Sequence, residues 1–177
     1  MSRIPLTSID EQPEPIRQWM ARRGNLKVFR LLANAPQVFP GWTQMVDELF
    51  ESPTFSRRMR EVVILRVAHL QGSRYELSQH VGIARNAGLT DQQINAIFDT
   101  DQPDVAGFSD TERTALDVTT ELCSTHQLRD DTFATAHAVF GDEALTELLM
   151  IISCYYGLAL VLNAADLDVD AAARFQP

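Results

Sequence analysis

The chain has 177 residues, of which 45% are hydrophobic, and carries a formal net charge of −9 with a pI near 4.8. A chain of this length and composition is expected to form one globular domain that buries about 70% of its unfolded surface. The acidic balance, with no long cluster of basic residues, argues against nucleic acid as a partner.

The two cysteines also limit the classes of protein to which the chain can belong. Cys123 and Cys154 are far apart and no Cys-x-x-Cys pair occurs, so the sequence predicts neither a disulfide framework nor a zinc site. A reducing, cytoplasmic compartment is the simplest setting. The N-terminus lacks a continuous apolar segment, and the longest apolar run, residues 148–162, is interrupted by polar residues and is short for a membrane span. We therefore predict neither a signal peptide nor a membrane helix.

The first 50 residues divide into an arm and a helical region. Residues 1–15 contain Pro5, Pro13 and Pro15 among polar residues, which predicts an extended arm that is suited to wrap a neighbouring subunit. From residue 16 the apolar residues recur at helical spacing in three stripes, and Pro36 and Pro40 separate the second from the third. We assign residues 16–177 to a single helical domain.

A strongly apolar helix is predicted over residues 57–70, with Thr54 or Ser56 as N-cap. Its β-branched run, residues 62–65, is also compatible with a buried strand, but the flanking charges and the total length favour a helix. Gly72 ends this helix. A second helix runs from Ser73 to about residue 87, where Gly88 supplies the left-handed conformation that closes it.

Two capping boxes mark helix starts in the second half of the chain. Thr90 with Gln93 opens a helix through residue 98, and Ser109 with Glu112 opens another through about residue 125. A polar loop containing Pro103 lies between them. A further helix covers residues 130–140, and the last, residues 143–165, is apolar on nearly all sides and belongs in the core or in a subunit interface. Because no alternating pattern occurs, the fold class is all-α.

Glu76 and His80 are the first candidates for chemistry. They stand four residues apart and therefore project from one face of their helix, where a carboxylate can orient an imidazole and raise its basicity. On a surface helix such a pair is an ordinary solvated contact. Here it follows a helix break behind an apolar helix, which favours a general acid–base role.

Glu61 is the third candidate, because a carboxylate inside an apolar run is costly unless it is paired. The alternative to a functional role is a structural salt bridge, for which Arg58, Arg60 and Arg66 are all close in sequence. The sequence alone leaves both interpretations open.

The order of these motifs resembles a known family. The segment from Arg60-Glu61-Val-Val-Ile-Leu-Arg66 through Glu76-Leu-Ser-Gln-His80 to Ile94 is similar to the carboxymuconolactone decarboxylase family, which includes the AhpD-like alkylhydroperoxidases. Residues 31–36 before it and 158–164 after it resemble the flanks of longer members. The resemblance implies an AhpD-like helical bundle.

The resemblance also shows what this chain lacks. In AhpD-like peroxidases the second helix begins with Cys-x-x-Cys followed by a histidine, with a glutamate twelve residues before the first cysteine. The matching positions here are Glu61, Ser73, Glu76 and His80. A serine forms no disulfide and a glutamate is not oxidised by peroxide, so thiol-dependent peroxide reduction is excluded at these positions.

The decarboxylase branch instead carries Glu-Leu-x-x-x-His, which residues 76–80 match. This implies a lyase acting without metal or organic cofactor on a small lactone or carboxylated ring, as in aromatic compound degradation. His80 would move the proton, while Glu76 and Glu61 set its protonation and position. The alternative is an AhpD-like protein without thiol peroxidase activity that binds small molecules or acts as a stress-associated interaction protein.

Further residues are predicted to contact a substrate. The set comprises Ser73, Tyr75, Arg66 and Trp42. A substrate carboxylate would need a cation, and the sequence does not choose among Arg60, Arg66, Arg74 and Arg85. Tyr155 and Tyr156 are candidates for a pocket or for the core, and Cys154 is expected to be a buried, inert thiol. The apolar last helix and the resemblance predict a homo-oligomer, as a dimer, trimer or hexamer.

Overall fold

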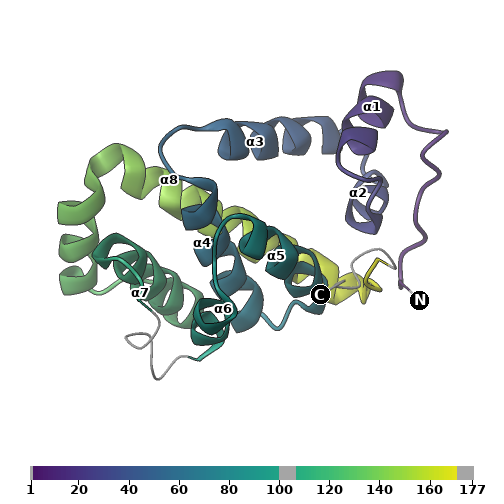
Figure 1. Cartoon of the computed structure of the whole chain (residues 1–177). Coiled ribbons are helices and arrows are strands. Elements are labelled where there is room, and N and C mark those ends of the chain that lie inside the picture. Colours follow the sequence, from purple (N-terminus) through teal and green to yellow (C-terminus); the bar gives the residue numbers. More distant parts are fainter. Residues whose placement is uncertain (1, 100–106, 171–177) are drawn as a thin grey trace.

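The computed structural model describes residues 2–99 and 107–170, and this part of the chain contains eight α-helices and no strand. The all-α prediction is therefore confirmed, while Pro103 lies outside the described residues. In chain order the helices are α1 (Glu14–Arg22), α2 (Lys27–Leu32), α3 (Phe39–Glu51), α4 (Arg57–Leu70), α5 (Arg74–Asn86), α6 (Asp91–Phe98), α7 (Asp110–Thr125) and α8 (Asp130–Ala165) (Figure 1).

Three predicted helix starts are confirmed by their caps, whereas the Ser73 side chain, expected to cap α5, makes no cap hydrogen bond. The Ser56 hydroxyl accepts a hydrogen bond from the Met59 N–H at 3.1 Å, which fixes the start of α4. Both capping boxes are formed, at Thr90 for α6 and at Ser109 for α7. Helix α1 begins at Glu14, two residues inside the segment predicted to be an extended arm, because the fixed φ of a proline suits the first turn of a helix and Pro15 occupies it.

Helix α8 is long but bent. Gly141 has φ 67° and ψ −177°, so the helical path breaks where the sequence predicted a boundary between residues 140 and 143. By length and composition α8 could cross a membrane. Its apolar residues instead form much of the core, since Leu148, Ile151 and Ile152 are at most 1% exposed. The helix packs against α4 and α7, as expected for a central core helix.

Helix α4 is the centre of the fold, and it packs against α5, α6, α7 and α8. Ten of its fourteen residues are buried. Helices α1 to α3 form a separate layer that lies across one side of this bundle, over α5 and the second half of α8 (Figure 1). The arm before α1 runs back beside the end of α8, where the Arg3 N–H donates to the Ala165 carbonyl at 2.7 Å. The two helical layers meet at the site described next.

Candidate active site

The turn between α4 and α5 brings Glu61 and His80 together. The Ser73 N–H donates to the Ala68 carbonyl at 2.9 Å and closes this turn, so that the two helices run back along each other. Glu61 on α4 is completely buried, and its Oε2 lies 2.8 Å from Nδ1 of His80 on α5. The carboxylate that the sequence placed in an apolar run is therefore paired with the candidate histidine.

Glu76 approaches the same imidazole from the other side. Its Oε2 lies 3.4 Å from Nε2 of His80, one helical turn away on α5. Glu76 and His80 are 4% and 7% exposed, so the imidazole lies between two carboxylates in a largely dry environment. Among the described residues, none of the arginines proposed as salt-bridge partners of Glu61 lies within ion-pair distance of it.

The two carboxylates decide the protonation of His80. Burial by itself lowers the pKa of an imidazole, but the Glu61 charge and hydrogen bond, together with those of Glu76, raise the pKa of His80 to about 10. At neutral pH the side chain is therefore an imidazolium. Its Nδ1–H donates to Glu61, and its Nε2–H lies toward Glu76 and is available as a proton donor.

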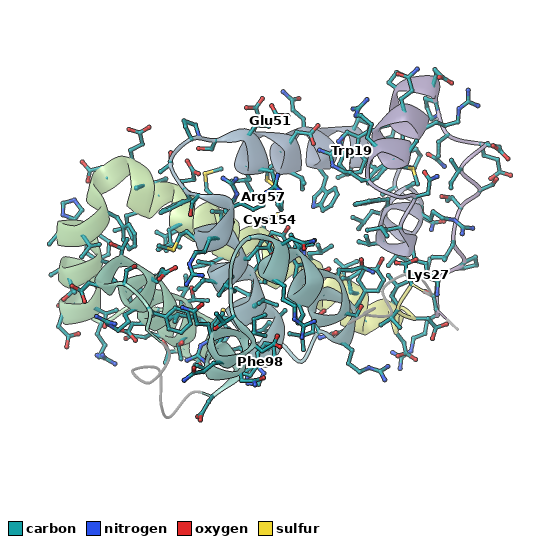
Figure 2. All side chains as sticks on the ribbon, viewed as in Figure 1. Trp19, Lys27, Glu51, Arg57, Phe98 and Cys154 are labelled. Atoms are coloured by element: carbon teal, nitrogen blue, oxygen red, sulfur yellow. The ribbon has the colours of Figure 1, made fainter. Side chains whose placement is uncertain are left out.

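Glu76 and His80 line a cavity of about 290 Å³ between the α1–α3 layer and helices α5 and α8. Figure 2 shows Trp19 in the α1–α3 layer and Cys154 on α8 beneath α3. The lining is mostly aromatic and aliphatic, with a few polar groups: Arg23, Leu26, Val28, Phe29, Trp42, Val46, Phe50, Tyr75, Glu76, Gln79, His80, Ile83, Cys154, Tyr155 and Leu158. An apolar cavity with one ionised cluster in its wall is typical of a small-molecule site.

Two of the four predicted substrate contacts reach this cavity. Tyr75 and Trp42 both line it. Ser73 is completely buried, its hydroxyl has no partner within the described chain, and it is not part of the lining. Arg66 lies away from the cavity, where its Nε donates to the Thr120 hydroxyl at 2.8 Å.

The cation in the cavity wall is Arg23, which the sequence did not single out. None of the four arginines proposed for a substrate carboxylate lines the cavity. The Arg23 guanidinium forms an ion pair with Asp47 and lies 4.3 Å from the centre of a Trp19 ring. Its position depends on packing between α1 and α3, which no local motif reveals.

Helix α8 contributes two further residues, Cys154, which the sequence assigned to the core, and Tyr155, which it left as a candidate for a pocket or for the core. Cys154, expected to be inert in the core, lies in the cavity wall and is half-buried. Burial and the Glu76 charge raise the pKa of its thiol to about 11, so it is protonated at neutral pH. The Tyr155 ring stands perpendicular to the His80 ring, with centroids 5.2 Å apart. The apolar pattern of α8 did not reveal which residues face the cavity.

The carboxylates and the imidazole of this site are not arranged as metal ligands in the described chain. Within residues 2–99 and 107–170, no group of three or more His, Cys, Asp or Glu side chains has the arrangement of a metal site. Two ion pairs involve the cavity wall, His80 with Glu76 and Arg23 with Asp47, which lies behind the lining. Proton transfer is the chemistry that the first pair can perform by itself.

Residues 36–121 match the carboxymuconolactone decarboxylase family. These residues belong to that family. The match includes Trp42 and all of α4 and α5, and so contains Glu61, Glu76 and His80. The resemblance seen in the sequence is confirmed. The family region ends before α8, so Cys154 and Tyr155 lie outside it. None of the curated proteins matches the chain.

Solved structures confirm the AhpD-like fold. An uncharacterized peroxidase-related protein from Ralstonia eutropha JMP134, described as an alkylhydroperoxidase AhpD core, has a TM-score of 0.85 at 18% identity, covering 97% of this chain and 94% of that one. A second uncharacterized peroxidase-related protein, from Silicibacter sp. TM1040, has a TM-score of 0.82 at 16% identity, with 99% and 95% covered. A cysteine-to-alanine variant of the debrominase Bmp8 with 2,3,4-tribromopyrrole has a TM-score of 0.80 at 18% identity, with 98% and 96% covered. At these identities the likeness concerns the fold.

Proposed function

We propose that this protein catalyses proton transfer on a small lactone or carboxylated ring, in a decarboxylation or a related reaction. The observation that carries the proposal is the buried His80 imidazolium, held between Glu61 and Glu76 in the wall of an apolar cavity. A charged acid next to a carboxylate, away from bulk water, is the arrangement that general acid–base catalysis requires.

The geometry suggests a distinct role for each side chain. Glu61 holds Nδ1–H and keeps the imidazole charged, so it acts on His80 and not on the substrate. Glu76 has no ionic partner other than His80 in the described chain, and it lines the cavity. Glu76 would accept a proton from the substrate, and Nε2–H of His80 would donate a proton to the substrate.

The cavity lining supports a planar ring as the substrate. Phe29, Trp42, Phe50 and Tyr75 surround the space with flat apolar surfaces, and about 290 Å³ accommodates a small ring. A planar ring compound, 2,3,4-tribromopyrrole, is bound in one protein of the same fold. If the ring carries a carboxylate, Arg23 is the cation in the lining that would face it, after exchange with Asp47.

The test measures turnover of a panel of small lactones and carboxylated lactones, with ultraviolet absorbance and carbon dioxide release as the readouts. The wild type is expected to convert at least one of them. His80→Gln and Glu76→Gln should each lower kcat by about 100-fold to 10,000-fold. His137→Gln is the matched control, because His137 is exposed and paired with Asp142.

Two outcomes would contradict the proposal. If His80→Gln left the turnover of every converted lactone unchanged, His80 would not be the acid. If the wild type bound rings tightly and converted none, the alternative, a small-molecule-binding or stress-associated protein without thiol peroxidase activity, would replace the enzyme.

We also propose that the protein forms a homo-oligomer in the cytoplasm. Met150, Leu160 and Val161 on α8 are 43–51% exposed, although large apolar side chains are usually covered. A second copy of the chain that covers them would form a dimer, trimer or hexamer. Light scattering that found only the 19.9 kDa monomer would contradict this assembly.

A further inference from the structure

The cavity wall contains a hydrogen-bond donor that the proposed reaction has not yet used, the phenol hydroxyl of Tyr155. Tyr155 is 7% exposed and lines the cavity from α8. Its ring stands at 89° to the ring of His80, with centroids 5.2 Å apart, and lies 6.5 Å from the ring of Phe50. The phenol is therefore a direct neighbour of the proposed proton donor.

Tyr155 differs from the other two tyrosines in having no partner for its hydroxyl. The Tyr75 hydroxyl donates to Asp170 and accepts from the Val28 N–H at 3.2 Å, and the Tyr156 hydroxyl is 3.0 Å from Nε2 of His126. In the part of the chain that the structure describes, the Tyr155 hydroxyl makes no hydrogen bond. Buried phenol hydroxyls normally have one.

The hydroxyl oxygen is also accessible. The fully enclosed side-chain atoms without a partner in the described chain belong to four other residues, Arg60, Glu61, Ser73 and Glu147. The oxygen of Tyr155 is not among them and so keeps accessible surface, on a side chain that lines the cavity. An open, unpartnered donor in the wall of a cavity is suited to a polar atom of a ligand.

The surrounding charges keep this donor protonated. Burial, followed by the Glu76 and Glu61 carboxylates, raises the pKa of Tyr155 well above its ordinary value. These carboxylates also disfavour any negative charge that develops on a substrate oxygen. Such an oxygen needs hydrogen-bond donors, and two neighbouring rings in the cavity wall carry one each, Nε2–H on His80 and the hydroxyl on Tyr155.

We propose that Tyr155 donates a hydrogen bond to the carbonyl oxygen of the substrate, beside Nε2–H of His80, and that the substrate is a cyclic ester or ketone whose reacting carbon adjoins that carbonyl. This inference rests on the proposed function, for which it specifies the substrate class. Tyr155 then touches the reacting group and is a catalytic residue.

The step balances without an oxidant or a reductant. Glu76 removes a proton from the carbon next to the carbonyl, or a carboxylate on that carbon leaves as carbon dioxide. In either case the released electron pair forms the carbon–carbon double bond of an enolate, and the negative charge moves to the oxygen held by Tyr155 and His80. In the first case the Glu76 carboxyl group returns the proton to another carbon of a conjugated ring, which shifts the double bond and restores the carbonyl group. In the second case Nε2–H of His80 protonates the carbon that has lost carbon dioxide, and the imidazole regains a proton from water.

A test that needs no turnover uses substituted phenols, whose phenolates resemble the enolate in shape and charge. Affinities are measured by calorimetry for the wild type, Tyr155→Phe and Tyr156→Phe. Loss of the donor should weaken phenolate binding by about 10-fold to 100-fold, the usual effect of a hydrogen bond to a charged group. Tyr156→Phe removes a hydroxyl one residue along α8 that pairs with His126, and should leave the affinity unchanged.

A measurement on the wild type alone keeps the proposal testable if Tyr155→Phe does not fold. Phenols are compared with the same rings lacking oxygen, and the oxygen should strengthen binding at least 10-fold. Equal affinity for both rings would overturn the proposal, as would phenolate binding by folded Tyr155→Phe at wild-type strength. If the wild type converts no lactone yet Tyr155→Phe loses phenolate affinity, the proposed function fails and the donor role of Tyr155 stands.

With an active lactone in hand, Tyr155→Phe should lower kcat by about 100-fold, with a smaller change in KM, because the hydrogen bond strengthens as charge moves to the oxygen. An unchanged kcat would overturn the catalytic role.

Discussion

Among the charged side chains that helix α4 buries, Glu61 and Arg66 lie five residues apart and are surrounded in opposite ways. Arg66 is 3% exposed, and it donates from Nε to the Thr120 hydroxyl at 2.8 Å and from Nη1 to the Ile97 carbonyl at 2.5 Å. None of its enclosed donors lacks a partner in the described chain. Glu61 is 0% exposed, and one of its oxygens, Oε1, has no partner there.

The difference supports the proposed role of Glu61 in chemistry and indicates that Arg66 stabilises the fold. A buried charge with all its hydrogen bonds made stabilises the packing of α4 against α6 and α7. An incompletely satisfied one is costly, and such groups concentrate at functional sites. The other oxygen of Glu61, Oε2, accepts the hydrogen bond from Nδ1–H of His80 and helps to keep this imidazole protonated. We expect substitutions at the two positions to separate activity from stability.

Of the substitutions at these two positions, Glu61→Gln is expected to have the larger effect on activity. The amide keeps the shape of the side chain but removes the charge that raises the pKa of His80, so the fraction of imidazolium at neutral pH falls. We expect kcat on an active lactone to fall by about 100-fold, with His80 titrating at lower pH by NMR. Asp142→Asn, which removes a surface carboxylate beside His137, is the control. An unchanged titration of His80 would break the assignment of Glu61 to the site.

Arg66→Met should lower the stability of the fold and leave activity unchanged, the opposite of Glu61→Gln. The substitution leaves the Thr120 hydroxyl and the Ile97 carbonyl without their donor, and we expect the free energy of unfolding to fall by about 2 kcal/mol. Activity should stay at the wild-type level, because Arg66 lies outside the cavity. Urea unfolding and lactone turnover of the same preparation measure both quantities. A specific loss of kcat or a rise in KM would restore Arg66 as the substrate contact that the sequence predicted.

The half of the site that lies on α4 and α5 was predictable because local rules determine it. The Ser56 cap and the break at Gly72 place the two helices, and the spacing of Glu76 and His80 puts them on one face. Its place in an apolar run made Glu61 a candidate, and the family resemblance then linked it to His80, nineteen residues later. Each of these relations spans one helix or one helix pair.

The opposite wall was not predictable because it depends on contacts between distant segments. Arg23, Cys154 and Tyr155 enter the cavity only when the α1–α3 layer folds over α5 and α8. Helix α8 is apolar on nearly all sides, so its hydrophobic pattern does not show which side faces a cavity. Tyr155 therefore remains a candidate for the pocket or for the core until the structure places it in the cavity wall.

The pH dependence of stability provides a third test, of the contacts between His80 and the carboxylates of Glu61 and Glu76. The folded-state pKa of His80 is raised to about 10 from an ordinary value of 6.5. The stabilisation that this supplies is therefore complete below about pH 6.5 and is lost as the pH rises toward 10, by at most about 1.4 kcal/mol per pH unit. Urea unfolding of wild type and His80→Gln at several pH values should show their difference shrinking over this range. A constant difference would mean that His80 is not an imidazolium in the folded protein.

The smallest effect is expected for Ser73→Ala. The Ser73 hydroxyl is buried, has no partner in the described residues and is not part of the cavity lining. It does not cap α5 through its side chain either. Removing an unsatisfied buried hydroxyl should raise the free energy of unfolding by up to about 1 kcal/mol, with kcat and KM unchanged. A rise in KM would mean that Ser73 contacts the substrate, as the sequence predicted, and that the α4–α5 turn opens when the substrate binds. Ser78→Ala provides the comparison, because the Ser78 hydroxyl donates to the Tyr75 carbonyl at 2.7 Å and its loss should not stabilise the fold.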